Sequence, residues 1–184
     1  MTMEAFKNLE EKMVASEEIF NGHVVHLFKD EIELPNGKPA TSEVVRHVGA
    51  VAVVPLTDDG KVIIERQFRY PLGCVITEIP AGKLDSKSED RLSAAKRELE
   101  EETGYTADEW IDLGDYYPAA AYTDERISLY LAKGLHQGKQ KLDADEFLNV
   151  ELVSLEELVQ DVLNGTITDG KTQAALLKAY LRLK

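Results

Sequence analysis

Three glutamates in the middle of the chain have a spacing that favours metal binding. Glu98, Glu101 and Glu102 stand at positions i, i+3 and i+4, so on a helix their carboxylates share one face. Such crowding destabilises a solvated helix, because like charges one turn apart cost roughly 0.2–0.5 kcal/mol per pair and carboxylates in the last turn oppose the helix dipole. A hard divalent cation such as Mg²⁺ takes oxygen ligands and relieves the repulsion. The residues alone leave two interpretations open, a metal site or an ordinary acidic surface.

The net charge of the chain argues against two classes of binding partner. The 184 residues carry a formal charge of −13, which repels nucleic acid and anionic membranes, so neither is expected as a partner. An anionic substrate therefore requires local arginines or a bound cation. The single cysteine, Cys74, excludes an intramolecular disulfide and a cysteine-cluster metal site, and the four histidines have no recognisable ligand spacing.

Length and hydropathy predict one main domain in the cytoplasm. No apolar run approaches the ~18–20 residues that a membrane span needs, and residues 1–12 are polar where a secretory signal has an apolar region. With 43% hydrophobic residues, the chain can bury one core but is too short for two comfortable ones.

The elements that must position the glutamates mix strands and helices without regular alternation. Ser86 and Ser154 each begin a capping-box spacing, Asp169 is a plausible N-cap, and Gly104 is placed to end the first helix. We therefore predict an α+β fold rather than a doubly wound sheet. Helices are predicted at residues 89–103, 154–163 and 172–183. Strands are predicted at residues 23–34, 41–47, 50–56, 61–68, 75–79, 111–117, 127–132 and 150–153, whereas residues 3–19 are polar and weakly patterned.

The three glutamates belong to a longer pattern. Gly82, Glu89 and the run Arg97-Glu98-Leu99-Glu100-Glu101-Glu102-Thr103-Gly104-Tyr105 resemble the Nudix box, the signature of a hydrolase superfamily. The family usually has five residues between the glycine and the first glutamate, whereas residues 83–88 make six here. A loop absorbs such a change in length cheaply.

The resemblance extends from about residue 20 to residue 181 and is most specific for the ADP-ribose pyrophosphatase branch. It rests on the segments at residues 20–24, 65–70, 78–83 and 123–125. One departure is Ala120-Ala121, where that branch often carries a Pro-Gly pair.

The resemblance implies a fold and an assembly. The fold is a Nudix α/β/α sandwich with a mixed sheet at residues 48–184, preceded by a small β extension at residues 1–47. In this branch the extension typically packs across a homodimer, so residues 20–34 are expected to help build the partner's adenine site.

The resemblance also implies a metal site and a catalytic base. Glu98, Glu101, Glu102 and the carbonyl of Ala81 match the positions that bind Mg²⁺, for which Mn²⁺ is a possible substitute. Glu146, in the acidic loop at residues 142–149, matches the catalytic glutamate of the family, and Glu101 competes with it for the role of base.

Four further residues are expected around this site. Arg97 is placed to hold a carboxylate, and Glu89 to brace the loop before the helix. Arg46 and Arg69 are the candidates for binding phosphate or the terminal sugar, because a guanidinium offers two parallel donors to phosphate oxygens. Glu78 matches a sugar-contacting carboxylate of the branch.

The implied reaction is Mg²⁺-dependent hydrolysis of a nucleoside diphosphate sugar, with ADP-ribose giving AMP and ribose 5-phosphate. The alternatives are another nucleotide sugar, a nucleoside triphosphate, or a non-catalytic module that senses a nucleotide. The intact glutamates argue against the sensor, because a sensor has no need of a metal cluster.

Overall fold

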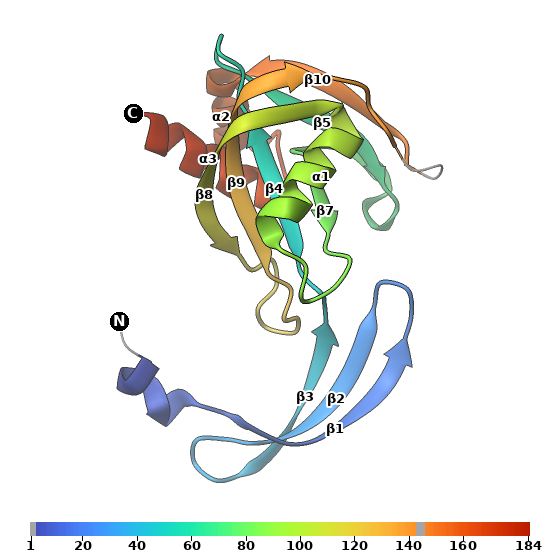
Figure 1. The fold of residues 1–184 in the computed structure, drawn as a ribbon. Coiled ribbons are helices and arrows are strands. Elements are labelled where there is room, and N and C mark those ends of the chain that lie inside the picture. Colours follow the sequence, from blue (N-terminus) through green and yellow to red (C-terminus); the bar gives the residue numbers. More distant parts are fainter. Residues whose placement is uncertain (1–2, 143–145) are drawn as a thin grey trace. The chain divides into compact units, whose positions relative to one another are not determined.

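The computed structural model describes residues 3–142 and 146–184 and divides them into two compact units. The first unit comprises Met1–His47 with Ala119–Glu125, and the second comprises Val48–Pro118 with Arg126–Lys184 (Figure 1). Within the described part of the chain, no helix has the length and apolar character needed to cross a membrane.

The first unit is a three-stranded antiparallel sheet. After the 3-10 helix η1 (Met3–Leu9), strand β2 (His26–Glu33) pairs with both β1 (Lys12–Asn21) and β3 (Pro39–Arg46). The predicted hairpin of β2 and β3 is confirmed. Strand β1 was not predicted, because residues 3–19 have only a weak hydrophobic pattern. Every residue of β1 is exposed, so the strand lacks the alternation of apolar and polar residues that reveals a half-buried strand.

The second unit contains two sheets. The larger one has the order β7-β4-β9-β8, in which β4 and β9 are parallel and the other pairs are antiparallel. The smaller sheet has the order β10-β5-β6 and is antiparallel throughout. The strands of this unit are β4 (Ala50–Pro55), β5 (Lys61–Arg69), β6 (Cys74–Glu78), β7 (Ala81–Lys83), β8 (Tyr105–Tyr116), β9 (Ile127–Gln137) and β10 (Leu148–Ser154), with the 3-10 helix η2 (Tyr70–Leu72) between β5 and β6.

Helices cover both faces of the larger sheet. Helix α1 (Arg91–Thr103) packs on the face to which Val51 and Val53 point, while Ala52 and Val54 point into the core shared with the other two helices. Those helices are α2 (Leu155–Leu163) and α3 (Gly170–Leu183). The second unit is therefore an α/β/α arrangement around a mixed sheet, and the predicted α+β class is confirmed (Figure 1).

The helix caps agree with the sequence at three of four positions. Ser154 and Asp169 cap α2 and α3, and Gly104 ends α1 in a left-handed conformation with φ 76°. The predicted start of α1 was wrong. Asp90 is the N-cap, because the carboxylate of Glu89 accepts a hydrogen bond of 2.6 Å from the N–H of Asp85 instead.

Candidate active site at the end of helix α1

The glutamates of α1 face a cavity of about 310 Å³. Helix α1 supplies one wall, the segment that begins with β7 supplies another, and Lys141 and Glu146 line it from the chain before β10. The lining residues are Ala81, Gly82, Lys83, Asp85, Arg97, Glu98, Glu101, Glu102, Lys141 and Glu146. Six of the predicted site residues are thus brought to one place in space, although they come from three separate segments.

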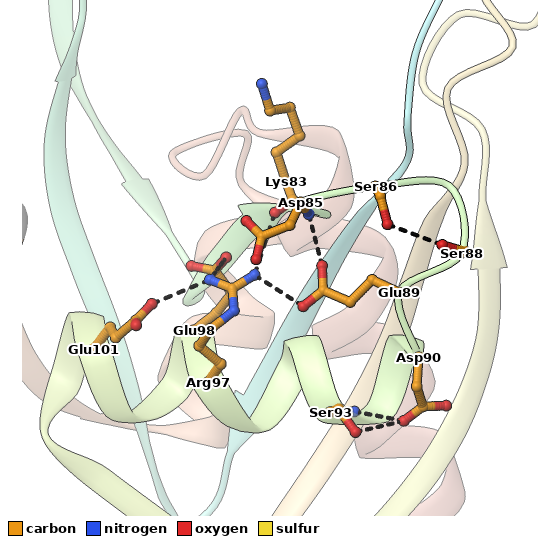
Figure 2. Close-up of polar contacts among 10 residues, drawn as sticks. All are labelled: Lys83, Asp85, Ser86, Ser88, Glu89, Asp90, Ser93, Arg97, Glu98 and Glu101. Carbon is orange, nitrogen blue, oxygen red and sulfur yellow. Dashed lines mark hydrogen bonds and ion pairs between the residues drawn. The ribbon is translucent and has the colours of Figure 1, made fainter.

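Arg97 connects the acidic side chains on one side of the cavity. Its Nη1 atom donates to Glu98 Oε1 at 2.7 Å and to Glu101 Oε2 at 3.1 Å, and its Nη2 atom lies 3.4 Å from Glu89 Oε1 (Figure 2). Glu89 therefore bridges Arg97 and the loop at Asp85, and it does so with six residues between Gly82 and Glu89. The guanidinium holds the carboxylates in place and partly offsets their mutual repulsion.

Glu98 and Glu102 are buried against strand β7. Glu102 Oε2 accepts a hydrogen bond of 2.9 Å from the backbone N–H of Ala81. The carboxylate of Glu98 occupies the space that a Cβ atom on Gly82 would need. Glycine at this position therefore lets Glu98 lie here, because any side chain would displace its carboxylate.

Burial and repulsion make these carboxylates costly to ionise. Burial raises the pKa of Glu102, and the charges of Glu65 and Glu98 raise it further. Burial also raises the pKa of Glu98, although Arg97 works in the opposite direction. Such a site gains free energy when a cation binds to it, because the cation stabilises the ionised carboxylates.

Glu65 is a buried acid to which the sequence analysis gave no role. It lies on β5 directly after three fully buried apolar residues, and only 3% of its surface is exposed. Its Oε1 atom is buried and has no hydrogen-bond partner among the described residues. Burial raises the pKa of Glu65, and the neighbouring charge of Glu78 raises it further. The sequence did contain a signal for this residue, because a charged residue that directly follows an unbroken apolar run of a strand is expected to be buried with it.

A network of ion pairs connects β5 and β6 with the first turn of α3. Glu78 accepts a hydrogen bond of 2.6 Å from Arg69 Nε, and its other oxygen is paired with Lys171 Nζ. Lys171 also lies 3.1 Å from Asp169, the N-cap of α3. Both carboxylate oxygens of Glu78 are thus engaged with cations. Lys171 had no sequence signal, because its partner lies 93 residues away in the chain.

Glu146 lines the cavity from the chain before β10. Its charge adds to the rise in the pKa of Glu98 and of Glu102, after burial and nearer carboxylates. The loop predicted at residues 142–149 also includes residues 143–145, which lie outside the described residues.

Arg46, the other predicted substrate-binding arginine, belongs to the first unit. Its Nη2 atom donates to both carboxylate oxygens of Asp30, at 3.0 and 2.9 Å, and its guanidinium lies 4.0 Å from the ring centre of Phe28. The Arg46 side chain is 30% exposed.

The donors fit a hard divalent cation, although they do not converge on one point. Within residues 3–142 and 146–184, no three histidine, cysteine or acidic side chains stand in an arrangement that could hold a metal ion. Glu98 and Glu101 are turned toward Arg97, and Glu102 is turned toward Ala81. Oxygen donors predominate around the cavity, two glutamates have raised pKa values, and the glycine backbone lets Glu98 approach closely. These properties fit Mg²⁺ or Mn²⁺ better than a soft metal.

Comparisons with known proteins point to the same chemistry. A sequence model of the NUDIX domain matches residues 46–175. An ADP-ribose pyrophosphatase of Bacillus subtilis (strain 168) is 46% identical over 180 residues, which cover 97% of this chain and 96% of that relative. A methanol dehydrogenase activator of Bacillus methanolicus is 44% identical over 180 residues, with the same coverage of the two chains. The crystal structure of an ADP compounds hydrolase is similar with a TM-score of 0.83 and covers 95% of this chain and 94% of that one; at 22% identity this likeness shows the fold alone.

Proposed function

Because the chain belongs to the Nudix family, we propose that it is a pyrophosphohydrolase that cleaves ADP-ribose to AMP and ribose 5-phosphate. The observation that carries this proposal is the cavity at the end of α1, where four glutamates and an arginine from two segments meet beside the backbone of β7. The choice of substrate is supported by the ADP-ribose pyrophosphatase that is 46% identical over almost the whole chain.

Glu98, Glu101, Glu102 and the carbonyl of Ala81 are the proposed ligands of a divalent cation. Nudix ADP-ribose pyrophosphatases depend on divalent metal in general, and we propose Mg²⁺ for this chain, with Mn²⁺ as a substitute. When bound, such a cation polarises the oxygens of the pyrophosphate and acidifies the attacking water. The cation also resolves the charge problem of the sequence, because it lets a protein with a net charge of −13 bind an anionic substrate.

The remaining residues of the site orient the reactants and move a proton. Glu146 is the proposed general base, which accepts the proton of the attacking water; its position in the lining of the cavity supports this role. Arg69, fixed in direction by Glu78, presents its guanidinium for a phosphate or sugar oxygen of the substrate. Arg97 keeps Glu98 and Glu101 in position and contacts no substrate. Glu78 then acts mainly through Arg69.

A homodimer that uses the first unit is part of the proposal. Strand β1 is exposed along its whole length and carries Met13, Val14, Ile19 and Phe20 in exposed positions, which suits burial against a second copy. We expect a chain that lacks residues 1–34 to be monomeric by light scattering and to bind substrate much more weakly. A full-length protein that is monomeric and fully active would refute this part.

A substrate panel distinguishes the proposal from its alternatives. Purified protein with Mg²⁺ is incubated with ADP-ribose, other nucleotide sugars and nucleoside triphosphates, and the products are resolved by chromatography. The highest kcat/KM is expected for ADP-ribose. The second relative suggests another role, activation of a methanol dehydrogenase. Activation that persists in a Glu102→Gln variant without hydrolysis would favour that role.

A further inference from the structure

Glu65 is a buried acid that the proposed reaction does not use. Strand β5 carries Val62, Ile63 and Ile64 into the core, and Glu65 follows them with 3% of its surface exposed. One of its carboxylate oxygens has no hydrogen-bond partner among the described residues. An ionised carboxylate in such a position is strongly destabilising unless a cation or a proton neutralises it.

The cationic side chains nearest to Glu65 already bind another acid. Glu65 stands directly opposite Glu78 in the pairing of β5 with β6. Arg69 and Lys171, whose charges act favourably on Glu65, both make their ion pairs with Glu78. Two buried carboxylates thus share two cationic groups that are both directed at only one of them.

Strand pairing and electrostatics connect Glu65 with the proposed metal ligands. Glu65 pairs with Glu78, the chain that leaves Glu78 reaches Ala81 three residues later, and the N–H of Ala81 binds Glu102. The charge of Glu65 also raises the pKa of Glu102, so the two carboxylates repel each other. A cation bound to Glu102 would therefore act favourably on Glu65 as well.

We propose that Glu65 is a further ligand of the divalent cation at the end of α1, through the oxygen that has no hydrogen-bond partner among the described residues. The inference rests on the cation site of the proposed function and deepens it. The cation site then draws carboxylates from β5 as well as from α1, so that metal binding joins the smaller sheet to the helix. Metal binding also neutralises the buried carboxylate of Glu65, whose nearest cationic groups are paired with Glu78.

Direct measurement of Mn²⁺ binding tests this inference in the absence of substrate. The full-length protein, freed of metal by chelation, is titrated with Mn²⁺, and the free ion is followed by electron paramagnetic resonance. We expect Glu65→Gln to bind Mn²⁺ at least about tenfold more weakly than the wild type, in the range seen when groups around a metal are altered. The same variant should melt at a higher temperature than the wild type in chelator, because it removes a buried repulsive charge.

Two further variants separate ligation from other effects. Glu151→Gln, on the neighbouring strand β10, removes the same charge at an exposed ion pair with Arg66 and should bind Mn²⁺ within about twofold of the wild type. Glu65→Asp keeps the charge but shortens the side chain, so a ligand role predicts weakened Mn²⁺ binding. Wild-type affinity in either Glu65 variant would overturn the inference. Failure to cleave ADP-ribose with normal Mn²⁺ binding would instead overturn the proposed function.

Discussion

The carboxylate of Glu98 lies against the backbone of Gly82, in the space that a side chain on residue 82 would fill. A Cβ atom there would overlap with both carboxylate oxygens and with the carbon that joins them. Strand β7 and the end of α1 are therefore fitted to each other at this point, and the fit depends on one glycine.

Gly82→Ala should impair catalysis more than folding. The added methyl group displaces Glu98, and a misplacement of about 1 Å at an active site costs on the order of 100-fold in rate. We expect kcat/KM for ADP-ribose to fall by about that factor while the far-ultraviolet circular dichroism is unchanged. Gly60→Ala is the control, because Gly60 has φ 80° and open space around it, so the variant loses some stability and keeps its activity. Full activity of Gly82→Ala would show that catalysis does not depend on the position of the Glu98 carboxylate.

The assignment of the catalytic base is tested by comparing two glutamates. Glu146→Gln should lower kcat by roughly 10²–10⁴-fold, the usual contribution of a general base, with KM and Mn²⁺ affinity little changed. Glu101→Gln should weaken metal binding, because Glu101 is a proposed ligand. If Glu101→Gln loses kcat with intact Mn²⁺ binding and Glu146→Gln keeps it, the base lies on the helix.

Lys171→Met tests the network that orients Arg69. The side chains of Lys171 and Glu78 are 12% and 4% exposed, and removing one member of a buried pair costs roughly 3–5 kcal/mol. We expect a free energy of unfolding lower by about 3 kcal/mol in urea titrations and a KM for ADP-ribose that is several-fold higher. The double variant Glu78→Gln/Lys171→Met should be more stable than Lys171→Met, because it leaves no uncompensated buried carboxylate. Additive losses in the double variant would argue against the network.

Stability in chelator should fall as the pH rises. Burial raises the pKa of Glu65, Glu98 and Glu102 in the folded protein. The folded state therefore keeps protons that the unfolded state releases, so the free energy of unfolding decreases above pH of about 4.5, the ordinary glutamate value. Saturating Mn²⁺ should remove this decrease, because it binds the ionised carboxylates of the folded state only. Melting temperatures across a pH series, with chelator and with Mn²⁺, measure the effect; a melting temperature in chelator that rises steadily toward neutral pH would disagree with it.

The sequence predicted those parts of the fold that have a local signal. Such signals lie within a few consecutive residues. They predicted the helix caps at Ser154 and Asp169 and the apolar strand β4, and the structure has all three. Strand β1 was missed because it is exposed on both sides and has no apolar periodicity. The start of α1 was misplaced because Glu89 binds the loop and Arg97 rather than the helix end.

In the candidate site, too, the residues with a local sequence pattern were predicted and those without one were not. The spacing of Glu98, Glu101 and Glu102 fixed their common face, and the structure adds that they surround one cavity with Glu146. The roles suggested here for Glu65 and Lys171 depend on strand register and on a contact across 93 residues, which no local pattern encodes.

The central claim is that the carboxylates at the end of α1 support metal-dependent cleavage of ADP-ribose. The most direct test is the initial rate of AMP and ribose 5-phosphate formation with Mg²⁺, compared for the wild type, the wild type in excess chelator, and Glu102→Gln. We predict equal amounts of the two products from the wild type, none in chelator, and a rate at least about 100-fold lower for a folded Glu102→Gln protein. Full activity in chelator or in Glu102→Gln would contradict the account.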